Sequence, residues 1–131
     1  MVVLSTVREA RRRAGAQWFG LLGGMSAFAL HLLSAFYLVP FSCFLGTRGP
    51  IYGVTALLGG VAVAAILVSW RLLDASGEHE RPEWRPGRGS RGERARFMAQ
   101  AGLILNVMGL AIILFAAAAM FAFDPCVNWQ V

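Results

Sequence analysis

Lysine is absent from this chain, and charged residues of every kind are scarce. All 12 basic residues are arginines, and charged residues make up 15% of the 131 residues, whereas an ordinary globular domain carries about 25%. Formal charge is missing altogether from three long stretches, residues 14–47, 49–70 and 97–123. A soluble fold this small needs a polar face on every element. The three uncharged stretches therefore exclude a soluble fold and indicate segments that lie in a bilayer.

The uncharged stretches predict three transmembrane helices, at about residues 17–39, 51–70 and 97–123. Each is long enough, because a span needs about 20 mainly apolar residues. Each must be helical, because lipid offers no partner to a free backbone amide. We therefore predict an all-α integral membrane protein with a single membrane domain over residues 1–131, in which Pro40 closes the first span. A cleaved signal peptide is the rival interpretation of that span, but the apolar run exceeds the usual length of about 7–15 residues.

The arginines are distributed unevenly about these spans. Eleven of the 12 lie before the first span, at the end of the second, or between the second and third, and only Arg48 lies elsewhere. Because cytoplasmic loops carry an excess of arginine and lysine, we expect the N-terminus in the cytoplasm and the C-terminus in the periplasm. The expected location is the bacterial cytoplasmic (inner) membrane, which the chain crosses several times.

Residues 74–96 are predicted to form a cytoplasmic loop, since glycines and prolines interrupt the segment. Its first half is acidic and its second half is basic. The stretch 85–92 is similar to RNA-binding arginine–glycine segments. The interpretation we favour is a cytoplasmic retention signal that also contacts anionic lipid, and no nucleic-acid partner is predicted.

Two spans carry small residues at four-residue spacing, a pattern that lets helix backbones approach closely in lipid. Gly20 and Gly24 follow this spacing in the first span, and Ala56, Gly60 and Ala64 follow it in the second. These residues are predicted to make helix–helix contacts. Such contacts can be internal or can involve another subunit.

Cys43 follows the first span and Cys126 follows the third. The predicted topology places both on the outer side at similar depth, in a compartment that is oxidising if it is a bacterial periplasm. We therefore predict a disulfide between them. The alternative is a thiolate copper or haem site, for which only Asp124 and His31 are further candidates, and metal sites usually need more ligands at close spacing. No resident metal or cofactor is predicted.

His31 is the ionisable residue that lies well inside a span, and such residues are candidates for function because their burial is costly. A proton relay or a haem ligand is one interpretation. The other is a neutral imidazole that is hydrogen-bonded to a backbone carbonyl or a partner helix. Asn106 is the main polar group of the third span, and a hydrogen bond to Ser26 at comparable depth is expected to join spans one and three.

Several short motifs together resemble a known family. They are His31-Leu32-Leu33, then Tyr37 to Pro40 and Cys43, an arginine-rich loop, and Asp124-Pro125-Cys126 at the end. This arrangement, over about residues 17–126, looks like the small three-span proteins encoded beside bacterial haem–copper cytochrome c oxidases. The resemblance implies a place in or near an aerobic respiratory complex, with His31, Cys43 and Cys126 as the positions that match the pattern.

No nucleophile–base pair, phosphate-binding loop or metal motif accompanies these features, so we predict that the chain is not an enzyme. The expected function is a non-catalytic accessory subunit of a respiratory membrane complex, with cytochrome c oxidase as the favoured partner. One alternative is an assembly factor that handles copper or haem, which would need reactive outer thiols. Another is a small transporter or channel subunit with a water-lined path past His31.

Overall fold

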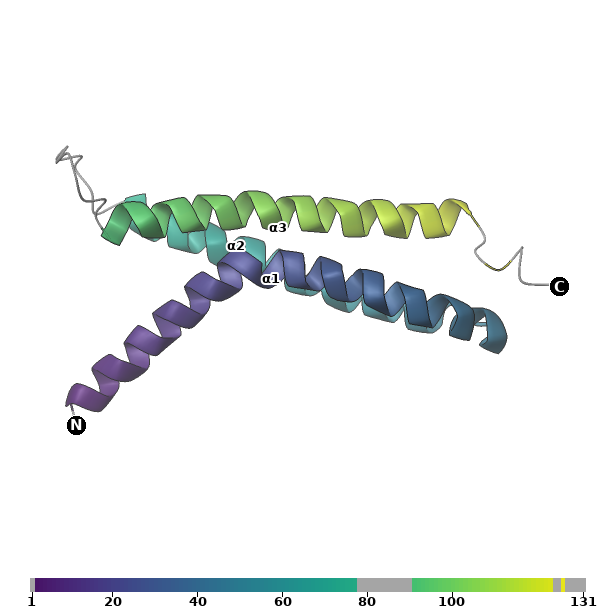
Figure 1. Ribbon diagram of the computed structural model, residues 1–131, viewed down its shortest axis with the longest axis horizontal. Coiled ribbons are helices and arrows are strands. Elements are labelled where there is room, and N and C mark those ends of the chain that lie inside the picture. The colour runs from purple at the N-terminus through teal and green to yellow at the C-terminus, as the bar shows by residue number, and fades with distance from the viewer. Residues whose placement is uncertain (1, 78–90, 124–125, 127–131) are drawn as a thin grey trace.

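The computed structural model describes residues 2–77, 91–123 and 126, and these form three long helices (Figure 1). Their bounds are α1 Val2–Leu45, α2 Gly49–Gly77 and α3 Arg91–Ala122, and each helix contacts the other two. All three are long and apolar enough to cross a membrane. The prediction of an all-α protein with three membrane-length apolar helices is therefore confirmed, and each predicted span falls on a different helix.

The first helix is longer than the span predicted from the sequence. Pro40 lies inside α1, which continues to Leu45. The helix ends instead at Gly46, whose φ of +64° is a left-handed conformation that suits glycine. The amide of Thr47 donates to the carbonyl of Ser42 at 3.2 Å, as in a typical helix C-cap.

The other two helices extend into the segment predicted as a loop. Since α2 reaches Gly77 and α3 begins at Arg91, both ends of the predicted loop 74–96 are helical. Residues 78–90, with most of its charges, lie outside the described residues.

Small and branched apolar side chains make the contacts among the helices. The central cluster consists of Ala27, Leu58, Ala62 and Ile113. Most large apolar side chains point outward instead, and Phe115, for example, is 78% exposed. A bundle with this much apolar surface on the outside is stable in hydrocarbon, and the chain is accordingly a multi-pass membrane protein.

The helix α1 is not straight. In Figure 1 its N-terminal part leaves α2 and α3 at a bend in the segment around residue 20, as the colour bar shows. Beyond the bend, the rest of α1 runs beside α2. The start of α1, the end of α2 and the start of α3 form one end of the molecule, which carries most of the described arginines and is called here the arginine-rich end.

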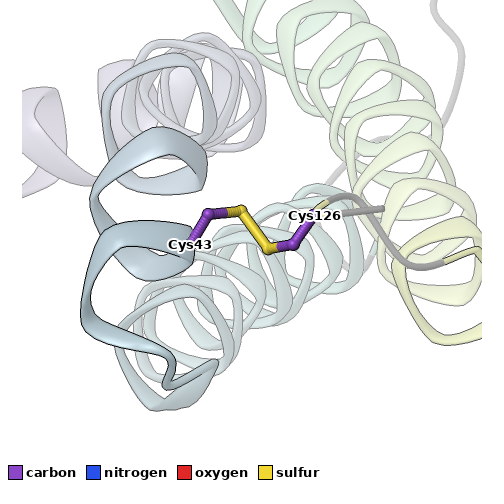
Figure 2. Close-up of a disulfide and its surroundings, with 2 residues drawn as sticks. All are labelled: Cys43 and Cys126. Atoms are coloured by element: carbon purple, nitrogen blue, oxygen red, sulfur yellow. A yellow bond between two sulfur atoms is a disulfide. The ribbon is translucent and has the colours of Figure 1, made fainter. Parts of the chain in front are cut away.

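A disulfide closes the opposite end. Figure 2 shows Cys43, on the last turns of α1, joined to Cys126, in the segment after α3. The Cα atoms are 5.6 Å apart, and 83 positions separate the two residues in the sequence. Near this end the rings of Tyr52 and Phe121 stack at 4.8 Å, which joins α2 to α3. The predicted pairing of the two cysteines is confirmed.

The disulfide makes the thiols inaccessible to alkylation until they are reduced. We expect denatured wild-type protein to take up no maleimide before reduction and two equivalents after it. The variant Cys43→Ser should take up one equivalent without reduction, at Cys126. The chain-entropy model gives an upper bound of about 4–5 kcal/mol for a bridge of this span, so Cys43→Ser should also unfold at lower denaturant concentration. Equal labelling of oxidised and reduced wild type would contradict the bridge.

Candidate functional site

The carboxamide of Asn106 lies between α3 and α1 and is fully buried. Its Oδ1 accepts a hydrogen bond from the backbone amide of Gly24 at 2.8 Å, and its Nδ2 donates to the backbone carbonyl of Gly20 at 2.6 Å. These two backbone groups are four residues apart, which is the spacing of one α-helical hydrogen bond. One side chain of α3 therefore holds both partners of a single turn of α1.

Ser69 brings α2 into the same cluster. Its hydroxyl donates to the carbonyl of Gly20 at 2.8 Å and lies 3.3 Å from Nδ2 of Asn106, from which it accepts. The four residues Gly20, Gly24, Ser69 and Asn106, called here the polar clamp, thus connect all three helices. Hydrocarbon offers no competing hydrogen-bond partner, so such contacts hold membrane helices together.

Glycine is required where the helices approach at the clamp. A Cβ atom at Gly24 would lie 2.6 Å from the Cα atom of Asn106, and one at Gly102 would lie 2.5 Å from the carbonyl oxygen of Gly20. Backbone atoms cannot move aside as a flexible side chain can. The predicted small-residue contacts of the first span therefore occur inside this chain, against α2 and α3.

The expected partner of Asn106 was wrong. Ser26 is exposed, and the hydrogen-bond partners of Asn106 are Gly20, Gly24 and Ser69 instead. Spans one and three are joined as expected, but through the backbone of Gly20 and Gly24. The role of Ser69 was not predicted from the sequence. The one feature that could have indicated it is the hydroxyl group in a mainly apolar stretch.

The clamp lies in the part of α1 where the helix bends. Sharp changes in helix direction occur where a side chain inserts into the ladder of backbone hydrogen bonds. Asn106 engages the carbonyl of Gly20 and the amide of Gly24, in the part of α1 where Figure 1 shows the N-terminal segment leaving the bundle. The clamp thus lies where α1 diverges from its neighbours.

His31 lies outside the clamp, closer to the disulfide end. It is buried, and its Nε2 lies 3.1 Å from the hydroxyl of Thr55 on α2. A hydrogen bond from His31 to another helix was one of the two interpretations of the sequence, and Thr55 is the partner that the sequence did not indicate. The other ring nitrogen, Nδ1, is buried without a hydrogen-bond partner in the described part of the chain. The space between His31, Thr55 and their apolar neighbours leaves no room for a water molecule.

The small residues of the second span lie on the opposite face of α2 from the clamp. Ala56, Gly60 and Ala64 are exposed, and a Cβ atom added to Gly60 would meet nothing within 4 Å. The inner face of α2 uses a different set of small residues, which are Ala62, Ala65 and Ser69. The helix α2 therefore has two small-residue faces, and in the part of the chain that the structure describes only the inner face packs against other helices.

The cysteines are bonded to each other, so neither presents a thiolate to a metal in this state. Among the described residues, no group of three or more His, Cys, Asp or Glu side chains could hold a metal ion. Asp124, the other candidate ligand, lies outside the described residues.

Comparisons with protein-family models, with curated proteins and with solved structures found no match for this chain. What the structure itself defines is a three-helix membrane protein with a buried polar clamp, a disulfide at one end and an exposed small-residue face on α2.

Glycine-to-alanine variants separate the inner approaches from the outer face of α2. We expect Gly24→Ala and Gly102→Ala to destabilise the protein by about 1–3 kcal/mol, because the new methyl group meets backbone atoms. The matched control Gly60→Ala should be neutral or stabilising by up to about 1 kcal/mol, since alanine favours a helix over glycine. Unfolding in mixed micelles titrated with dodecyl sulfate measures the difference. Equal effects at the three positions would contradict the packing described.

Removal of the clamp side chain is the second test. The variant Asn106→Ala loses hydrogen bonds to α1 and α2, and interhelical bonds of this kind contribute about 0.6 kcal/mol each on average. We expect a loss of about 1–2 kcal/mol in the same unfolding titration. Gln100→Ala, an exposed polar residue on the same helix, is the control and should change stability by less than about 0.5 kcal/mol. If Gln100→Ala lowered the free energy of unfolding as much as Asn106→Ala, the hydrogen bonds of the clamp would not be a specific source of stability.

Proposed function

We propose that this chain is a non-catalytic accessory subunit of a larger membrane complex, which it contacts through the outer face of α2. The observation that carries the proposal is the exposed stripe Ala56, Gly60 and Ala64, at whose centre a Cβ atom added to Gly60 would meet no described residue within 4 Å. Exposed leucine and valine side chains, among them Leu57, Val63 and Leu67, flank the stripe. A groove of small residues between larger apolar ones fits a second helix at short distance.

A respiratory complex of the bacterial inner membrane, with cytochrome c oxidase as the favoured one, is the proposed assembly. Support for this choice comes from the sequence motifs around His31, Cys43 and Cys126 and their resemblance to proteins encoded beside such oxidases. In the proposed orientation the arginine-rich end faces the cytoplasm and the disulfide end faces the periplasm. Eleven of 12 arginines on one side support the first part, and a bridge suited to an oxidising compartment supports the second.

In this proposal the chain contributes surface and anchoring and no chemistry of its own. The polar clamp holds three helices in one arrangement, and the disulfide fixes their far ends, so that a rigid helix face is presented to the partner. The arginines of the segment 74–96 would contact anionic lipid at the cytoplasmic surface.

A bulky residue in the stripe should release the partner without unfolding the chain. Because a Cβ atom at Gly60 meets nothing within 4 Å, Gly60→Leu should leave the fold intact. We expect mild-detergent purification of tagged wild type to recover other subunits and haem absorbance, and Gly60→Leu to recover at least tenfold less of both. Ala111→Leu, at an exposed alanine of α3, is the matched control and should behave as wild type.

Different results would point to different functions. Wild type that purifies alone, without haem absorbance, contradicts the subunit proposal. Copper bound to wild type, or a free Cys43 thiol trapped in cells, would favour an assembly factor. Altered ion or solute flux in His31→Ala, with complex assembly unchanged, would favour a transporter subunit.

A further inference from the structure

A crevice opens between the three helices at the arginine-rich end. Its volume is about 580 Å³, within the usual range of about 300–1,000 Å³ for small-molecule sites. All three helices contribute to its walls, and the residues that define it include Arg13, Gln17, Ser69, Leu72, Ala95 and Ala99. The stripe on the outer face of α2 is not part of it.

The crevice follows from the bend and from small side chains. The N-terminal part of α1 leaves α2 and α3 at the bend (Figure 1). The crevice lies between this part of α1 and the other two helices, because Arg13, Gln17 and Gly20 line it together with residues of α2 and α3. The neighbouring helices do not fill this space, because three of the residues that face it are alanines, Ala75, Ala95 and Ala99. In a membrane such a space does not stay empty, so an occupant is required.

Polarity changes in order along the crevice. Among the described residues that line it, only Arg13 is charged, and this residue is exposed. Gln17 lies one helical turn further along α1 and is half-buried. The innermost lining residues, Gly20 and Ser69, already satisfy each other at 2.8 Å within the clamp. The leucine and alanine walls offer only apolar contact.

We propose that this crevice binds one anionic glycerophospholipid. The phosphate pairs with the guanidinium of Arg13, the ester region lies beside the amide of Gln17, and the upper acyl chain packs on Leu72 and the alanines. One such lipid matches the lining of the crevice, which is charged at the rim, then polar, and apolar along its walls. The proposal rests on the crevice and is independent of the accessory role.

A protein helix fits the crevice less well than a lipid does. An apolar helix seated there would cover Arg13 and remove its charge from water without a partner, which is costly at membrane depth. An anionic phosphate supplies that partner and its own apolar chain together. Free phosphate would satisfy Arg13 but would leave the apolar walls without contact.

Lipid binding to the purified full chain tests the proposal directly. The protein is delipidated in neutral detergent and titrated with dioleoylphosphatidylglycerol or dioleoylphosphatidylcholine, and native mass spectrometry counts bound lipid. We expect one phosphatidylglycerol to bind at least tenfold more tightly than phosphatidylcholine. Arg13→Gln should weaken phosphatidylglycerol binding about tenfold, as expected for one lost charge-assisted contact. Arg12→Gln removes the same charge one position earlier, outside the lining residues, and should change the affinity less than twofold.

A second variant tests the cavity itself. Ala95→Phe fills part of the space and should also weaken phosphatidylglycerol binding about tenfold. The unfolding titration with dodecyl sulfate reports whether each variant is folded. Equal losses in Arg12→Gln and Arg13→Gln, or equal affinity for the two lipids, would overturn the proposal. Displacement of the lipid by millimolar inorganic phosphate would assign the site to a free anion, and a dimer that Ala95→Phe abolishes would assign it to a second copy of the chain.

Discussion

The arrangement of this molecule depends on one carboxamide that forms hydrogen bonds to two backbone groups of a neighbouring helix. Asn106 reaches the carbonyl of Gly20 and the amide of Gly24, and this approach needs glycine at position 24, where a Cβ atom would lie 2.6 Å from the Cα atom of Asn106. In water these hydrogen bonds would gain little, since solvent satisfies the same groups. In hydrocarbon it determines which turns of α1 and α3 meet, and Ser69 extends the same contact to α2. The three-helix contact and the bend in α1 lie at this position, and the crevice opens beside it.

The helix α2 shows how small residues can serve two purposes on one element. Toward the bundle, Ala62, Ala65 and Ser69 bring α1 and α3 close. On the opposite face, Ala56, Gly60 and Ala64 leave a second shallow surface exposed. A helix that only faced lipid would gain more contact from leucine and phenylalanine, as the outer surface of α3 does with Phe115 and Leu114. This contrast between two outward faces of one bundle is the reason to expect a neighbour at α2.

The sequence was sufficient for features that depend on length, charge and chain order. The uncharged stretches predicted three membrane-length helices, and the positions of Cys43 and Cys126 after two spans of the same direction predicted their bond.

The sequence was insufficient where the rotation of a helix about its own axis decides which side chains meet. Depth in the membrane alone suggested Ser26 as the partner of Asn106, but Ser26 lies on an exposed face of α1. The true acceptor includes the backbone carbonyl of Gly20, and a sequence does not indicate which backbone carbonyl accepts a side-chain hydrogen bond. The residues Thr55 and Ser69 were missed for the same reason, because their side-chain directions follow from packing. Pro40 was expected to end the first span, yet the helix continues to Leu45 and ends where Gly46 adopts a left-handed conformation.

The bridge between Cys43 and Cys126 turns most of the polypeptide into a covalent ring that contains α2 and α3 whole. Such a ring cannot close while the third hydrophobic segment is still outside the bilayer, because one sulfur would then be on the wrong side or too far away. Oxidation therefore comes after the last helix has crossed, and the closed ring marks a chain whose membrane integration is finished. A single cut between α2 and α3 would open the loop but leave both fragments attached to each other.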